Sequence, residues 1–80
     1  MNKITPVFTT IPSTPTIDNS KKNAWIRSSG YRYIDFDKAV GADIDRNWYS
    51  GMNAGNHPTE AGAKALFARF ILDFPEITIA

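Results

Sequence analysis

The absence of cysteine is the feature that most limits how this chain can fold. The chain has 80 residues, no cysteine and one histidine, so disulfides and thiolate metal sites are excluded and a zinc site is not expected. A single core in a chain of this size rarely contributes more than about 3–5 kcal/mol. We therefore expect one partial domain over residues 1–80, without metal or cofactor, whose core is completed by a partner surface or by further sequence.

Composition and charge exclude several classes of partner. The composition, 42% hydrophobic and 21% charged, is that of a globular protein. The net charge is +1, and among the nine basic residues only Lys21 and Lys22 are adjacent. The sequence therefore lacks the clustered basic residues that are typical of nucleic-acid binding. No run of about 18 apolar residues is present, which argues against a membrane span. We predict no nucleic-acid partner and no membrane partner.

The first half of the chain predicts a βαβ unit. Residues 4–11 and residues 31–36 are rich in β-branched and aromatic side chains and are predicted to be strands. Between them, Asp18 is expected to cap a helix that runs to about Ser29, with Gly30 as its stop. A helix of this length between two strands predicts that the strands are parallel and that the fold class is α/β.

The second half predicts a long connection and a final helix. Residues 37–56 form a mixed segment with a short helical turn expected near residues 37–41. The final helix is predicted from Thr59 or Glu60 to Asp73, with Thr59 as its cap. Its wide apolar face is expected to pack on the sheet and contains Ala63, Leu66, Phe67, Phe70, Ile71 and Phe74.

The only histidine, His57, directly precedes Pro58 at the start of this final helix. Loops at the carboxyl ends of parallel strands are where α/β folds place their chemistry. A histidine in such a loop either has a functional role or is a surface residue whose ring packs on Pro58 or caps a turn. The residues alone leave both alternatives open.

Three stretches resemble the C-terminal part of the SGNH/GDSL family of ester hydrolases. "GNHPTEAGAKALFARFI" resembles the family's last block, in which a histidine, usually followed by proline, precedes a helix of small residues. "ITPVFTTIPSTPT" resembles the strand after the family's asparagine-bearing block, and "NAWIRSSGYRYIDFDKAV" resembles the helix and strand that follow. The resemblance covers about residues 4 to 75. It implies a three-layer, flavodoxin-like α/β/α sandwich, to which this chain contributes two parallel strands and two main helices.

The resemblance implies that His57 is the general base that takes a proton from a nucleophilic serine. An acidic residue normally lies three positions before that histidine and orients its ring, but Ala54 occupies this position here. Asn53, Asp43 and Asp45 are near in sequence without having the spacing of the motif. Asp35, at a strand end, is expected to be structural or to support a neighbouring site residue. The residue that orients His57 is therefore left open.

The family's serine block and its two oxyanion blocks have no counterpart in this chain. Ser50 is the only serine close to His57 in sequence, and its surroundings do not resemble a nucleophile elbow. Two hypotheses follow. The chain is a segment of an acyl or carbohydrate esterase, inactive alone and completed by a protein partner, or it is a non-catalytic interaction protein that associates through its sheet edges and helix face. Ala54 favours the second hypothesis, and the pair His57–Pro58 favours the first.

Two aromatic residues of the long connection are candidates for substrate binding. Trp48 and Tyr49 are adjacent and lie within ten residues of His57. Aromatic rings can stack on sugar rings or line an apolar cleft. The resemblance implies that the substrate would be an ester, such as an acylated carbohydrate.

Overall fold

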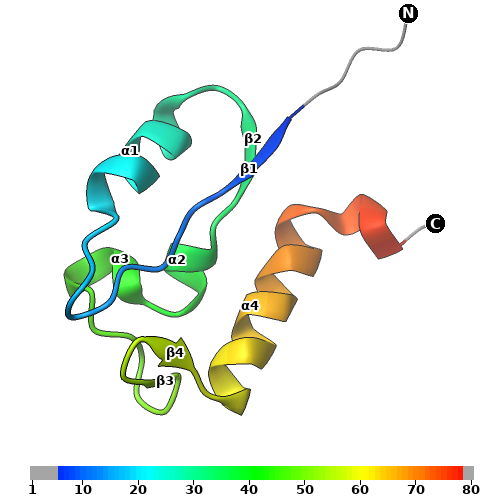
Figure 1. Cartoon of the computed structure of the whole chain (residues 1–80). Helices are drawn as coiled ribbons and strands as arrows, with labels where there is room; N and C mark the ends of the chain where they lie inside the picture. Colours follow the sequence, from blue (N-terminus) through cyan, green and yellow to red (C-terminus); the bar gives the residue numbers. More distant parts are fainter. Residues whose placement is uncertain (1–5, 79–80) are drawn as a thin grey trace, which may run out of the picture.

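A two-stranded parallel sheet lies at the centre of the chain (Figure 1). The structure, a computed structural model, describes residues 6–78. Strand β1 (Val7–Thr9) pairs in parallel with β2 (Arg32–Ile34), and Phe8 lies opposite Tyr33. Helix α1 (Ser20–Ser28) connects them. The predicted βαβ unit and the α/β class are confirmed.

Both strands are shorter than the sequence predicts. The first strand ends at Thr9, although the backbone N–H of Thr10 still donates to the carbonyl of Ile34 in β2. Residue 11 is not part of the strand, and residues 4 and 5 of the predicted strand lie outside the described residues. The second strand stops at Ile34 because the Asp35 carboxylate accepts the backbone N–H of Lys38 and caps helix α2 (Phe36–Ala39). The expected turn at residues 37–41 is therefore a helix that begins one residue earlier. A second short helix, α3 (Ala42–Asp45), follows it.

The start of α1 differs from the expected cap. The N-cap residue is Asn19, and the Asp18 carboxylate instead accepts the backbone N–H of Ser20 at 2.9 Å in the turn before the helix. At the other end, Gly30 has the predicted stop geometry, because its φ of 84° lies in the left-handed region that favours glycine.

A small hairpin and a long helix complete the fold. Strands β3 (Asn53–Ala54) and β4 (His57–Pro58) form an antiparallel pair, and helix α4 (Glu60–Asp73) follows directly. The predicted cap of α4 is confirmed, since the Thr59 hydroxyl accepts the N–H of Gly62 at 3.2 Å. A 3₁₀ turn, η1 (Pro75–Thr78), ends the described chain.

The two longer helices lie on opposite faces of the sheet (Figure 1). On one face, Phe8 of β1 packs edge-on against Trp25 of α1, with 6.0 Å between ring centroids. On the other face, Phe70 and Phe74 from the end of α4 line a hollow with Val7 and Ile34 of the strands. The sheet is therefore covered from both sides although it has only two strands.

The buried interior is mainly polar, and much of the apolar surface is outside. Only Ile34, Val40 and Ala42 are buried hydrophobic residues in the described part of the chain. The buried polar residues are Thr10, Ser13, Thr14, Asn19, Asn23, Asp35 and Asp37. The expected apolar face of α4 is partly wrong, because Phe67 is 68% exposed, Ala63 is exposed, and Gly62 is the only buried residue of the helix.

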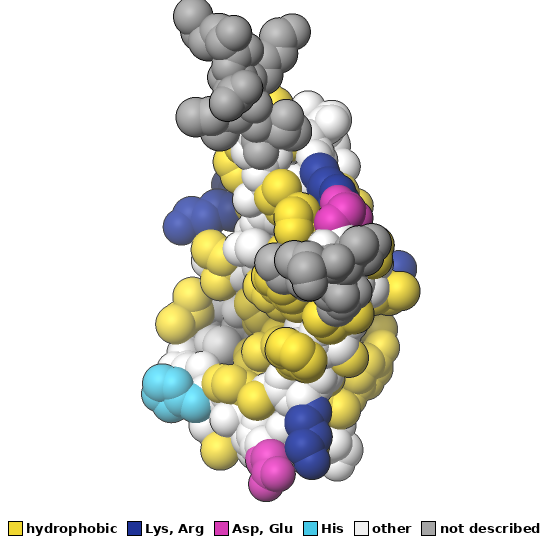
Figure 2. Space-filling model, turned by 90° about the vertical axis from the view of Figure 1, so that its right-hand side faces the viewer, with side chains coloured by type: hydrophobic (Ala, Val, Ile, Leu, Met, Phe, Trp, Pro, Cys, Tyr) yellow, Lys and Arg dark blue, Asp and Glu magenta, His cyan; other side chains and the backbone are white. Residues whose placement is uncertain are grey.

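Hydrophobic side chains gather on the face that contains α4 (Figure 2). In the described part of the chain as a whole, large apolar residues with high exposure include Ile44, Phe67 and Leu72, which are 76%, 68% and 67% exposed. A two-stranded sheet provides too little surface to cover a helix that is apolar around most of its circumference. Of the helices in residues 6–78, none has the length and hydropathy that a membrane crossing needs.

Candidate functional site

The carboxyl ends of the two parallel strands carry a buried ionic cluster. Asp35 and Asp37 follow β2, and Arg27 reaches them from α1. The guanidinium donates through Nε to Asp35 Oδ2 at 3.0 Å and through Nη2 to Asp35 Oδ1 at 2.8 Å. The same Nη2 also donates to Asp37 Oδ2 at 3.1 Å. Arg27 therefore holds both carboxylates at the end of the sheet.

Residues that follow β1 also form hydrogen bonds to Asp35 and Asp37. The Thr10 hydroxyl donates to Asp35 Oδ1 at 2.9 Å and accepts the backbone N–H of Asp37 at 2.9 Å. The backbone N–H of Ser13 donates to Asp37 Oδ1 at 3.0 Å, and the Ser13 hydroxyl accepts the N–H of Asn19 at 2.9 Å. Within residues 6–76, every buried side-chain nitrogen and oxygen has a hydrogen-bond partner.

The electrostatics of the cluster favour its ionised form. Burial opposes ionisation of Asp35, but hydrogen bonds from Arg27 and Thr10 outweigh it and hold the pKa of Asp35 below its ordinary value of 3.8. The hydrogen bond to Asp35 in turn raises the pKa of Arg27. Both shifts favour the ionised forms of Asp35 and Arg27, so this ion pair stabilises the fold at neutral pH. The expected structural role of Asp35 agrees with this arrangement.

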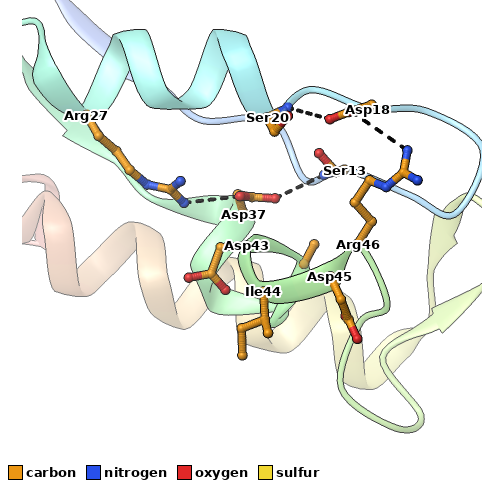
Figure 3. Close-up of a pocket in the computed structure, with 10 residues that line it drawn as sticks. Ser13, Asp18, Ser20, Arg27, Asp37, Asp43, Ile44, Asp45 and Arg46 are labelled. Carbon is orange, nitrogen blue, oxygen red and sulfur yellow. Dashed lines mark hydrogen bonds and ion pairs between the residues drawn. The ribbon is translucent and has the colours of Figure 1, made fainter.

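A polar pocket of about 270 Å³ lies beside the cluster (Figure 3). Arg27 and Asp37 line one side, and the residues of α3 line another. The remaining lining residues are Ser13, Asp18, Ser20 and Arg46. Within the described part of the chain, no three histidine, cysteine or acidic side chains are placed to share a metal ion.

His57 lies on the hairpin, away from this pocket's lining residues. Its backbone pairs with Ala54, and its side chain is exposed. In the segment from residue 6 to residue 78, the imidazole takes part in no hydrogen bond, ion pair or ring contact. Both of its nitrogens are therefore available to a group outside this chain.

Two contacts fix the place of the hairpin. The Thr16 hydroxyl donates to Asn56 Oδ1 at 3.0 Å, which joins the hairpin to the loop that follows β1. On the other side, the backbone N–H of Thr59 donates to the carbonyl of Met52 at 3.0 Å. Gly62 packs so closely on this carbonyl that a Cβ atom would collide with it. His57 is therefore held next to the loop at the carboxyl end of β1, the edge where parallel sheets place ligands.

The described residues supply no carboxylate for the imidazole. Ala54, at the position of the family's acid, pairs with His57 through its backbone alone. The Asn53 amide donates to the carbonyl of Gly55 at 2.9 Å and is used within the turn. Asp43 and Asp45 lie on α3 and line the polar pocket instead.

Trp48 and Tyr49 diverge although they are adjacent in sequence. The indole Nε1 of Trp48 donates to the carbonyl of Ser13 at 2.7 Å, which anchors the long connection to the loop after β1. The ring of Tyr49 packs on Gly41 and lines a different hollow, of about 430 Å³, together with Leu72 of α4. The aromatic pair therefore does not form one surface. Its proposed role in substrate binding stays a prediction.

Sequence reasoning missed the ionic cluster and an amide that closes the edge of the sheet. The Asn23 side chain accepts the backbone N–H of Ile11 at 2.8 Å and donates to the Ile11 carbonyl at 2.7 Å. Two signals in the sequence point to these features. Asp35 and Asp37 alternate directly after a strand, and Asn23 and Arg27 are one helical turn apart on α1.

Comparisons of this chain with protein-family models, with curated proteins and with solved structures give no match.

Proposed function

We propose that this chain is the C-terminal segment of an SGNH/GDSL-type serine ester hydrolase and that it supplies His57 as the general base. One observation carries the proposal. The imidazole is exposed and uncommitted, and its hairpin is joined to the loop at the carboxyl end of a parallel strand. A surface histidine with a structural role would instead bind a neighbouring group. The serine, the oxyanion donors and the group that orients the imidazole come from a protein partner.

The proposed chemistry follows from what a free imidazole can do. His57 accepts the proton of the partner's serine hydroxyl as that oxygen attacks the carbonyl carbon of an ester. The same proton then passes to the departing alcohol oxygen. Both transfers require a separation of about 2.6–3.2 Å between the imidazole nitrogen and the oxygen. An exposed ring on a fixed hairpin can reach such a serine once the partner has docked.

The proposed substrate is an acyl ester or an acylated carbohydrate. Tyr49 supports an aromatic contribution, because the residue is 52% exposed and its hollow includes the apolar α4 residues Ala65, Ala68 and Leu72. The indole nitrogen of Trp48 is already used in the fold, so only its ring faces are free for stacking.

A second candidate function is that of a non-catalytic interaction protein. The exposed apolar residues favour it, because Phe67, Leu72 and Trp25 are 68%, 67% and 59% exposed. Trp25 lies on α1, and Phe67 and Leu72 lie on α4, so both outer helices present exposed apolar side chains of the kind found at contact sites for other proteins. Under this candidate His57 has no partner serine, and the surfaces of α1 and α4 are the functional part.

Ester hydrolysis distinguishes the two candidates. The chain alone should hydrolyse p-nitrophenyl acetate no faster than free imidazole does, because it offers a base without an oxyanion site, which would contribute roughly 2.7–4 kcal/mol. The protein encoded directly upstream, if it contains a Gly-Asp-Ser block, should restore turnover when it is mixed with this chain. Labelling of its serine by a fluorophosphonate should then require this chain.

Matched variants make the result specific. In the mixture, His57→Ala should abolish turnover and labelling, and Ser50→Ala should leave both unchanged. Turnover that survives His57→Ala would refute the proposed role of the histidine. Turnover by the chain alone that is lost on Ser50→Ala would refute the need for a partner.

A further inference from the structure

One edge of β1 has backbone groups that no described strand uses. The backbone N–H of Thr10 donates to the carbonyl of Ile34 in β2 at 3.0 Å. In a parallel ladder, alternate residues direct both backbone groups to the same neighbour. Phe8 and Thr10 therefore face β2, and Val7 and Thr9 direct their N–H and C=O groups to the opposite side. Within residues 6–78, β1 has β2 as its only neighbour in the sheet.

The unpaired backbone groups of this edge end before Ile11. At Ile11, the next residue that points outward, the Asn23 amide already binds both the N–H and the C=O groups. The Asn23 side chain, which comes from α1, thus makes the two hydrogen bonds that a neighbouring strand would make with Ile11. In the described part of β1, pairing with another strand is confined to Val7 and Thr9, on either side of Phe8.

We infer that a second copy of this chain docks at this edge, with β1 paired antiparallel to β1 of the copy about a two-fold axis at Phe8. Val7 of each copy then lies opposite Thr9 of the other copy. Each of these two pairs exchanges two backbone hydrogen bonds, as hydrogen-bonded antiparallel pairs do. The open groups of β1 are thereby satisfied by the same groups of the copy, which is the condition for an isologous contact. The sheet becomes four-stranded in the order β2, β1, β1, β2.

The side chains beside the edge fit this arrangement. Phe8 lies at the axis and faces α1, where its ring contacts Trp25 and Tyr31 at centroid separations of 6.0 and 5.2 Å. The two Phe8 residues become directly opposite neighbours on this face, an aromatic pair that stabilises antiparallel strands. Apolar hollows of about 440 Å³ and 260 Å³ lie beside β1, one next to Trp25 and one next to Phe70.

The size and charge of the contact determine its strength. Three paired residues and two shallow hollows give an interface below about 1,200 Å² in total, the range of weak and transient complexes. The net charge of +1 per chain is small, but Lys21 and Lys22 line the hollow next to Trp25 in each copy, so like charges beside the contact oppose association. We expect reversible dimers with a dissociation constant in the micromolar range. The inference rests on the fold alone and does not depend on the proposed esterase role.

Sedimentation equilibrium of the purified chain tests the inference, with Thr9→Pro as the decisive variant. Proline removes the outward N–H of Thr9 and leaves the bonds to β2 intact, as proline does on edge strands. Because the symmetric contact loses two hydrogen bonds, the dissociation constant should rise at least about tenfold. Thr9→Val keeps the N–H and a β-branched side chain, so its dissociation constant should stay within about twofold of the parent value.

Hydrogen exchange gives a second readout that does not depend on how Thr9→Pro folds. In the unchanged chain, the amides of Val7 and Thr9 should become more protected as the protein concentration rises through the dissociation constant. A monomer up to millimolar concentration with unprotected Val7 and Thr9 amides would overturn the inference. So would a dimer that survives Thr9→Pro but is lost on Phe67→Glu, because that dimer would use the outer face of α4.

Discussion

The ionic cluster of Arg27, Asp35 and Asp37 and the hairpin of His57 both contact the loop that follows β1 but are held very differently. In the cluster the two carboxylates are almost completely buried and the guanidinium makes three hydrogen bonds to them. The imidazole of His57 is exposed and makes none within the described residues. Strong mutual binding marks the cluster as part of the structure, whereas the uncommitted imidazole is the group to which we assign the proposed chemistry.

The largest expected effect is the loss of one member of the cluster. Asp37→Ala leaves part of the Arg27 charge and the N–H of Ser13 without partners in a buried site. Removing one partner of a buried ion pair typically costs about 3–5 kcal/mol, which is as large as the stability expected of a chain this small. Circular dichroism should show a chain that is unfolded or melts without cooperativity.

Asp43→Ala is the matched control for this change. Asp43 lies on α3 with an exposed side chain, so its removal should alter the free energy of unfolding by no more than about 0.5 kcal/mol. Equal losses for the two variants would show that the cluster contributes no more to stability than a surface carboxylate.

A smaller effect is expected where the hairpin rests on α4. Gly62→Ala would raise helix propensity by about 1 kcal/mol in an open position, but here the new methyl group collides with the carbonyl of Met52. Overpacking of this kind typically costs about 1–3 kcal/mol, so the variant should be less stable than the parent and its hairpin should shift. Urea unfolding measures the first effect, and the chemical shifts of the His57 ring report the second.

Ala63→Gly is the matched control, because it measures the effect of a glycine–alanine exchange on the stability of α4 without a collision. Ala63 is exposed on the same helix, so this change should cost about 1 kcal/mol through helix propensity alone. Stabilisation by Gly62→Ala would mean that the hairpin is not seated on α4 as described.

The cluster also predicts how stability depends on pH. Because the pKa of Asp35 is lower in the folded chain than its ordinary value of 3.8, ionised Asp35 stabilises the fold and the unfolded chain takes up the proton first. This contribution is complete above about pH 4 and is lost as the pH falls through the lower, folded pKa. Thermal melts between pH 2 and pH 6 should show Tm falling in this window.

Asp35→Asn removes this titration and separates it from that of other carboxylates. The variant should melt at a lower temperature at pH 6 and should lose less stability between pH 4 and pH 2 than the parent. An unchanged pH profile in Asp35→Asn would show that Asp35 is not linked to folding.

The sequence predicts the parts of this fold that depend on periodicity and caps. The βαβ order, the stop at Gly30 and the cap of α4 by Thr59 could all be predicted, because each depends on neighbouring residues. The strand over residues 31–36 was predicted too long because its last residues instead cap and begin α2. That choice depends on Thr10 and Arg27, which are distant in sequence.

The candidate site could be predicted only in part for the same reason. The place of His57 before Pro58 makes it a candidate in the sequence, and the structure joins its hairpin to the loop after β1 through Thr16 and Asn56. Its catalytic role stays a prediction. The apolar pattern of α4 predicted burial of Phe67, which is exposed, because periodicity shows which face of a helix is apolar and not how much surface is present to cover it.

The smallest expected change in stability is that of His57→Ala. Our central claim is that this histidine is free for the proposed chemistry and contributes nothing to the fold, and this variant tests the claim most directly. Urea unfolding of His57→Ala, compared with the parent chain at pH 7, gives the contribution of the imidazole to stability. The account predicts a change of no more than about 0.5 kcal/mol, the range of surface substitutions without specific contacts. A loss of more than about 1 kcal/mol would contradict it, because His57 would then be part of the structure that holds the hairpin in place.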